Sequence, residues 1–310
     1  MVAVQRERVL PAVPAETTQD RPVDRPGLYR RPVQRKADRR RAKARRPYRL
    51  ASERLWAWTA ERLRRGWSPL PICGRLRLEH PGDETMRCCP ETLYRWVYAD
   101  RTRRERWARC LPRGHRRRRR ARGGGVARIR IPGRTPIRER PYEPSDRSRF
   151  GEWEADSVIG AGCNLHTEVE RRTRFLMARI VPDKTADASV AAQIAMFSAL
   201  PAGARTGVTH DNGTEFARHG RLRERLGMAT YFADPYSLCQ RGGSENRNGA
   251  IRRHLPKRTR IDPSMAADVQ AIVDETDNRP MRVLGYRTPA EAFTDELLEL
   301  TNEQGRCTSK

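Results

Sequence analysis

Long apolar runs are missing from this sequence. Its most apolar stretch, ASVAAQIAMFSAL at residues 188–200, is shorter than the about 20 residues that a membrane-spanning helix needs. Residues 1–20 contain no continuous apolar core, so no signal peptide is expected. The seven cysteines include no C-x-x-C pair, which argues against a zinc ribbon and against a disulfide scaffold. These absences predict a cytoplasmic protein with no membrane partner.

Acidic residues are scarce in the first half of the chain. Residues 1–150 contain 42 Lys and Arg against 16 Asp and Glu, whereas residues 151–310 contain 22 of each, so the whole formal charge of +26 lies in the first half. Such asymmetry predicts a polyanionic partner for that half. DNA or RNA fits, because neutralised phosphates release counterions. An anionic membrane surface is the alternative, but the basic stretches lack the apolar face that an interfacial helix needs.

Two segments have too few apolar residues to predict a packed structure. Residues 1–47 are basic and rich in Pro and Arg, and we expect them to be mostly disordered. Residues 113–140 are expected to be a basic flexible linker that can lie along a phosphate backbone or in a minor groove. A solvated spacer is the simpler interpretation, and the two are compatible. The linker contains a run of five arginines: Arg116, Arg117, Arg118, Arg119 and Arg120.

Residues 48–112 show apolar residues at helical spacing. Ser52 can cap a helix over 52–66, Ser68 and Pro69 can begin a second helix, and a third is expected at 90–99. The side chains expected to face inward include Leu55, Leu63, Ile72, Leu76, Leu78, Leu93, Tyr94 and Val97. Three short helices with a basic surface resemble a helix-turn-helix DNA-binding region. A small helical bundle without a DNA role is the alternative.

Residues 141–305 alternate between strand and helix patterns. The expected segments are a strand at 151–160, a hairpin at 165–181, a helix at 184–200, a strand at 206–213, a helix at 214–227, a strand at 228–234 and a helix from about Ser244. This order predicts an α/β domain, in which helices pack on a mixed sheet.

Three acids of this domain are candidates for a shared site. Asp156 lies on the first expected strand, Asp211 follows the fourth strand, and Glu245 begins a helix. Chemistry collects at the strand ends of open sheets, so the three carboxylates can meet there. They would repel one another without a cation, whereas two Mg²⁺ ions about 3.5–4 Å apart would hold them and clamp a phosphodiester. Taken singly, each acid is more simply a helix cap or a solvated charge.

Basic side chains follow Glu245 along the same expected helix. Arg252 comes seven residues later, about two helical turns, and so lies on the same face. Arg253, Lys257 and Arg258 continue the positive surface. A helix that carries a carboxylate to bind metal and several cations to bind phosphate suits the active site of an enzyme that acts on nucleic acid.

Five strings then identify a family resemblance. They are WEADSVIG, THDNGTEFARH, YFADPYS, SENRNGAIRRHLPK and NRPMRVLGYRTPAEAF, in this order. Together with the 33 residues between Asp211 and Glu245, they resemble the IS-thirty family of bacterial insertion-sequence transposases. The resemblance covers roughly residues 50–100 and 141–295. It implies an Asp-Asp-Glu catalytic core on an RNase H-like fold, which has a mixed five-stranded sheet with flanking helices.

The resemblance also implies roles for single residues. Asp156, Asp211 and Glu245 are expected to bind two divalent ions, Mg²⁺ or Mn²⁺, and Arg252 is expected to hold DNA. Residues 278–293 are expected to close the domain with a loop and a last helix.

The chain departs from the family pattern in several places. Cys239 stands where the family usually has an aromatic residue, and Gly243 and Ser244 precede Glu245 where the family usually has Thr-Asn. Cys89 stands where a Ser would cap the third helix, and loss of a cap costs about 1 kcal/mol. These departures suggest a truncated or decaying copy that has kept its metal ligands.

The resemblance implies a bacterial, nucleoid-associated DNA transposase. Such an enzyme binds the terminal inverted repeats of its element, cleaves them by Mg²⁺-dependent hydrolysis and joins the freed 3′ end to target DNA by transesterification. Its partners are double-stranded DNA at the element ends and the target, and further copies of itself, with no small-molecule substrate. The alternatives are a catalytically impaired copy that only binds DNA, and a nuclease that cuts without joining.

Overall fold

The computed structural model describes residues 34–40, 49–99, 101–111, 131–143, 145–234 and 242–307. It divides into two units, Met1–Tyr48 and Arg49–Lys310. In the first unit, the described residues 34–40 are helical. The arginine run Arg116–Arg120 and Cys239 lie outside the described residues.

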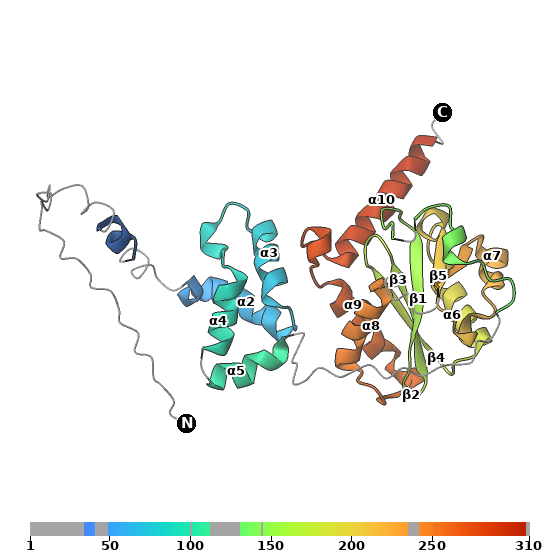
Figure 1. Ribbon diagram of the computed structural model, residues 1–310, viewed down its shortest axis with the longest axis horizontal. Helices are drawn as coiled ribbons and strands as arrows, with labels where there is room; N and C mark the ends of the chain where they lie inside the picture. The colour runs from blue at the N-terminus through green and yellow to red at the C-terminus, as the bar shows by residue number, and fades with distance from the viewer. Residues whose placement is uncertain are drawn as a thin grey trace, which may run out of the picture. The chain divides into compact units, whose positions relative to one another are not determined.

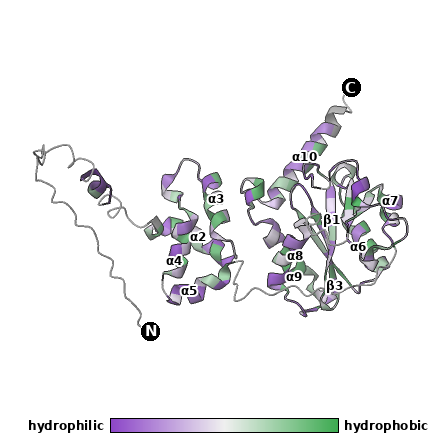
Figure 2. Cartoon of the chain, in the orientation of Figure 1, coloured by the Kyte–Doolittle hydropathy of each residue, from purple (hydrophilic) through white to green (hydrophobic). Residues whose placement is uncertain are grey.

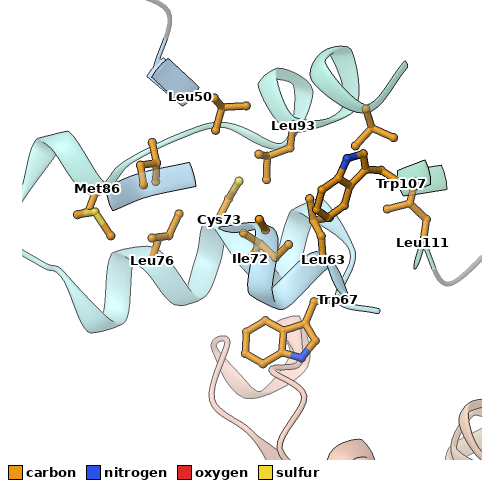
Figure 3. Close-up of a cluster of buried hydrophobic side chains, with 13 residues drawn as sticks. Leu50, Leu63, Trp67, Ile72, Cys73, Leu76, Met86, Leu93, Trp107 and Leu111 are labelled. Carbon is orange, nitrogen blue, oxygen red and sulfur yellow. The ribbon is translucent and has the colours of Figure 1, made fainter. Parts of the chain in front are cut away.

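The second unit begins with a group of helices that share a buried apolar core. The helices are α2 (Glu53–Arg64), α3 (Pro69–Glu79), α4 (Pro90–Tyr98) and α5 (Arg101–Trp107). Figure 3 shows this core, which is lined by Leu63, Ile72, Leu76, Leu93 and Trp107 among others. Three tryptophans close one side of it, with Trp56 and Trp96 ring centroids 4.0 Å apart.

The helix boundaries in this region follow from local chemistry. Ser52 caps α2, since its side chain accepts a hydrogen bond from the Leu55 backbone N–H. Pro69 is the first residue of α3, where its missing N–H costs nothing. Two inward positions were wrongly predicted, because Tyr94 is 38% exposed and Leu78 is 49% exposed. Neither side chain is needed inside, since neighbouring apolar residues already fill the core.

The rest of the unit is built on a five-stranded mixed sheet with the order β4-β3-β1-β5-β6. The strands are β1 (Glu152–Val158), β3 (Asn164–Glu170), β4 (Leu176–Val181), β5 (Gly207–His210) and β6 (Ala229–Phe232). On one side of β1 the strands pair antiparallel, β1 with β3 and β3 with β4; on the other side β1, β5 and β6 are parallel. This is the mixed five-stranded, RNase H-like sheet expected from the sequence, so the fold class is confirmed.

Helices cover both faces of this sheet (Figure 1). On one face, Trp153 and Ala155 of β1 share a core with Phe197 of α6 (Ala186–Phe197). On the other face, Val158 shares a core with Ile251 of α8 (Gly242–His254) and with α9 (Ala266–Asp277). Figure 2 shows hydrophobic and hydrophilic residues interspersed along the strands and helices, so these elements have no long apolar runs. The alternation of side chains along β1 therefore decides which residues meet α8.

Some elements differ from the sequence prediction. The helix expected over 214–227 is a 3₁₀ turn, Thr214–Phe216, followed by α7 (Gly220–Leu226), which ends at Gly227 with φ 68°. A small parallel pair, β2 (Ala161–Gly162) with β7 (Arg260–Ile261), was not predicted. The last helix, α10 (Pro289–Cys307), follows the expected loop. No helix in the described part of the chain is long and apolar enough to cross a bilayer.

Candidate active site

Asp156 lies near the carboxyl end of the central strand β1, on the face that α8 covers. Its Oδ2 accepts a hydrogen bond from Asn248 Nδ2 at 2.9 Å, and its Oδ1 accepts one from the Ser157 backbone N–H at 2.8 Å. Thr167 on β3 donates to the Asp156 carbonyl at 3.1 Å and to Asn248 Oδ1 at 3.0 Å. The half-buried Asp156 carboxylate is thus oriented from both the sheet and the helix.

Asp211 comes directly after β5, the parallel neighbour of β1. The register pairs Glu154 with Thr209, so two further steps along both strands bring Asp156 level with Asp211. Adjacent strands lie about 4.8 Å apart, and residues level with each other point to the same face. The Asp211 side chain also accepts a hydrogen bond from the Gly213 backbone N–H at 2.8 Å, which closes the turn after the strand. The two acids therefore lie at the same end of two neighbouring strands, Asp156 on β1 and Asp211 directly after β5.

Glu245 is exposed in the first turn of α8. This helix follows β1 in the same direction, as three successive contacts show: Ser244 with Glu154, Asn248 with Asp156, and Arg252 with Ile159. Glu245 precedes Asn248 by about one helical turn. The helix that carries the third predicted acid is therefore tied directly to the first acid.

Glu154 was not predicted from the sequence, although it shares a face of β1 with Asp156. Its fully buried carboxylate accepts a hydrogen bond from the Ser244 backbone N–H at 2.9 Å and lies 3.3 Å from the guanidinium of Arg171. A Cβ at Gly243 would come within 2.7 Å of Glu154 Oε2, so a larger residue there would displace this carboxylate. Glu154 therefore fixes the start of α8, one residue before Glu245. The sequence signal for this residue is that Glu154 lies two positions before Asp156 on the same expected strand.

The predicted acids suit a hard divalent cation by their chemistry, since carboxylate oxygens are the ligands that Mg²⁺ and Mn²⁺ prefer. In this conformation, however, no three His, Cys, Asp or Glu side chains of the described residues are grouped closely enough to hold a metal ion. Asp156 and Asp211 lie at the same end of neighbouring strands, whereas Glu245 is exposed in the first turn of α8.

The predicted basic residues lie in different settings. Arg252 donates to the Ile159 carbonyl at 2.7 Å and so joins α8 to the end of β1. Arg253 is exposed near the end of α8. Lys257 and Arg258 are also exposed, but they follow the helix, which ends at His254, and Arg258 has a left-handed φ of 70°.

A buried polar cluster lies on the opposite face of the sheet and was not predicted. Gln193 of α6 donates to Glu168 at 2.7 Å and lies 3.0 Å from His210 Nε2, while His166 Nε2 lies 2.8 Å from Glu168. All four side chains are buried. Because His210 immediately precedes Asp211, this network stabilises the end of β5 on the face of the sheet opposite the predicted site.

Comparison with known proteins adds an independent finding. The chain is 34% identical over 253 residues to the transposase for insertion sequence element IS1086 of Cupriavidus metallidurans, covering 80% of this chain and 74% of that protein. It is 34% identical over 241 residues to transposase InsI for insertion sequence element IS30C of Escherichia coli, covering 74% of this chain and 62% of the relative. It is 33% identical over 264 residues to the transposase for insertion sequence element IS4351 of Bacteroides fragilis, covering 84% and 79%.

No protein-family model matches the chain. Among solved structures, the catalytic core domain of BIV integrase aligns with 49% of this chain and 98% of its own, at 17% identity and a TM-score of 0.39. The family is established by the sequence relatives, because they match most of this chain. For two of them, the chain also covers about three quarters of the relative's own length. The chain belongs to the IS30 family of insertion-sequence transposases.

Proposed function

We propose that this protein is a DNA transposase that cleaves the ends of an insertion sequence and joins them to target DNA. One observation carries the proposal: Asp156 is hydrogen-bonded to α8 about one turn after Glu245, and Asp211 directly follows β5, the parallel neighbour of the strand that carries Asp156. An acid pair at a strand end, with a third acid on the covering helix, suits phosphoryl transfer. The family membership favours the same chemistry.

In this proposal, Asp156, Asp211 and Glu245 hold two Mg²⁺ or Mn²⁺ ions. Such ions, when bound, neutralise phosphate charge and act as Lewis acids. Asn248 and the Ser157 backbone N–H keep the Asp156 carboxylate in one orientation, and Glu154 keeps the start of α8 in place.

The reaction has two steps that share a site. In the first, a water oxygen bonds to the scissile phosphorus and the bond to the 3′ oxygen breaks, which leaves a 3′-hydroxyl and a 5′-phosphate. In the second, that 3′-hydroxyl oxygen bonds to a phosphorus of the target, whose own 3′ oxygen leaves. The basic first half of the chain would hold the element ends, and two ends imply at least a dimer on DNA.

Labelled element ends incubated with the purified chain and Mg²⁺ test the proposal. Wild-type protein should nick and join the DNA, whereas Asp156→Asn should lose at least about a thousandfold in rate, the scale on which loss of one electrostatic group in an active site acts. Asp268→Asn, an exposed acid on α9, is the matched control and should keep full activity. Undiminished nicking by Asp156→Asn would rule out the mechanism.

A second candidate function is DNA binding without cleavage, as in an impaired copy. It is favoured by the exposed position of Glu245 and by the lack of a three-acid cluster among the described residues. Calorimetry with Mn²⁺ separates the two, because an active enzyme should bind the ion more tightly than its Glu245→Gln variant. Equal, weak binding by both proteins would favour the impaired copy.

A further inference from the structure

An open cavity lies along the outer face of α8, beside Glu245. Its volume is about 420 Å³, and its lining includes Gly242, Glu245, Gly249 and Arg253 of the helix, with Arg279 as the facing wall. The helical residues repeat every three or four positions and therefore share one face. This face is separate from the one that Ser244, Asn248 and Ile251 turn toward the sheet.

Two guanidinium groups line this cavity close to each other. Arg253 is exposed, whereas the Arg279 side chain is only 16% exposed, pairs with Glu275 at 3.0 Å and donates to the Arg65 carbonyl oxygen at 3.3 Å. Burial first, and the positive charge of Arg253 second, lower the pKa of Arg279 to about 10. A bound anion would relieve this repulsion, since it would pair with both cations at once.

Gly249 supplies a second, independent observation. It lies inside α8, where glycine is less favourable than alanine, and its φ is not positive. A Cβ at this position would meet no atom of the described residues within 4 Å. Packing therefore does not require glycine here, and the lack of a side chain leaves the helix backbone open to close approach from this side.

We propose that this cavity binds a phosphodiester group of the DNA strand that is being cut, next to Glu245. Arg253 and Arg279 pair with the phosphate oxygens, and Gly249 leaves room for the sugar-phosphate backbone against the helix. The inference rests on the proposed function and deepens it, because it assigns Arg279 and Gly249 to DNA contact. It also predicts which side of α8 the DNA strand follows.

The charge contribution is tested by the salt dependence of DNA binding. Binding of the full chain to a fluorescent duplex is measured by anisotropy in EDTA, so that no cleavage occurs. Arg279→Gln should lower the slope of log Kd against log salt by about 0.9, the value for one lost phosphate contact, and Arg279→Lys should restore it. Arg225→Gln, an exposed arginine on α7, is the control for loss of one charge elsewhere. An Arg279→Gln slope equal to that of wild type would overturn the proposal.

The steric contribution is tested by substitution of Gly249, which should raise the stability of the protein and weaken its binding to DNA. Gly249→Ala should raise the melting temperature, because alanine favours the helix, and yet weaken DNA binding several-fold; Gly249→Val should weaken binding more. A more stable variant that binds DNA as tightly as wild type would contradict the inference.

These outcomes are independent of the catalytic proposal. If Asp156→Asn abolishes nicking while the Arg279 and Gly249 variants bind normally, the cavity assignment is wrong and the transposase mechanism stands. If the variants bind poorly but wild-type protein neither nicks nor joins, the phosphate site stands and the catalytic proposal is wrong.

Discussion

At the scale of single residues, three acids of the same region have very different surroundings. Glu154 is fully buried, Asp156 is half-buried and Glu245 is exposed. Glu154 has a partner of opposite charge deep in the core, the 1% exposed Arg171. We therefore assign Glu154 to positioning, and the two more accessible acids to chemistry.

Substitution of Glu154 should affect both the stability of the protein and the Mg²⁺ concentration that nicking requires. Glu154→Ala leaves the buried Arg171 without its carboxylate and should lower the free energy of unfolding by about 3–5 kcal/mol, measured by urea denaturation. Glu154→Gln keeps an acceptor for the Ser244 N–H and should cost less. It should still raise the Mg²⁺ concentration needed for half-maximal nicking, because Glu245 is held less firmly.

DNA affinity in EDTA provides the necessary contrast. It should be unchanged in Glu154→Gln if the residue only positions Glu245. The exposed Glu143 gives a matched control, and Glu143→Gln should behave as wild type in both assays. A Glu154→Gln protein with normal metal dependence would show that the start of α8 needs no charged partner.

At the scale of elements, α8 and α9 are joined by a buried ion pair. Arg247 of α8 contacts Asp277, the last residue of α9, and also donates to the Thr276 carbonyl at 3.3 Å. Asp277 in turn accepts a hydrogen bond from the Leu176 N–H of β4 at 3.2 Å. Burial raises the pKa of the Asp277 carboxyl to about 7. These contacts hold both helices against the antiparallel side of the sheet.

Removal of Arg247 should therefore destabilise the domain in a pH-dependent way. Arg247→Met leaves Asp277 buried without its cation and should cost about 3–5 kcal/mol at neutral pH. Its absence raises the folded-state pKa of Asp277 above about 7. Between about pH 4 and pH 7 the carboxyl is then protonated in the folded state with or without Arg247, so the loss should be nearly constant there and should grow as the pH rises above 7. Urea denaturation at several pH values checks this. Arg247→Met with Asp277→Leu should recover most of the loss, and a pH-independent loss would contradict the explanation.

The sequence predicted the elements whose signals are local. The strand at β1, the hairpin of β3 and β4, and helix α6 follow from alternation and helical spacing over a few residues, and Ser52 and Gly227 mark helix ends by their own chemistry. The β2–β7 pair was missed, because each partner is two residues long and pairing depends on a contact about a hundred positions away. The break before α7 was missed as well, since its apolar pattern is compatible with one continuous helix.

The candidate site was predicted only in part for the same reason. Asp156, Asp211 and Glu245 stand out by family resemblance, but Asn248, Glu154 and the cavity at Arg279 depend on how α8 lies across β1. The placement of α8 across β1 leaves no pattern in the local sequence. The roles of the three acids remain predictions that mutation will test.

At the scale of the whole molecule, charge is divided between two parts of the chain. The entire excess of +26 lies in residues 1–150, whereas the remainder, which carries the candidate active site, is neutral. Nonspecific affinity for DNA is governed by phosphate neutralisation. The first part should therefore dominate binding, and the second part should act on DNA that is already held.

The arginine run Arg116–Arg120 gives this division a direct test. Replacing all five residues by Gln should lower the salt slope of duplex binding by up to about 4.5, or about 0.9 for each lost phosphate contact. Replacement by Lys keeps the charge and should leave the slope nearly unchanged. A wild-type slope in the Gln variant would mean that the run is only a spacer.

The composition of α8 has a consequence for how the enzyme switches on. Its 13 residues include three glycines, two asparagines and a serine, which are poor helix formers, so little helix would persist if the segment detached from the sheet. Its order comes from contacts with residues outside it: Ser244 with Glu154, Asn248 with Asp156, and Arg247 with Asp277. A cation or nucleic acid that binds this segment should therefore stabilise the helix that carries Glu245.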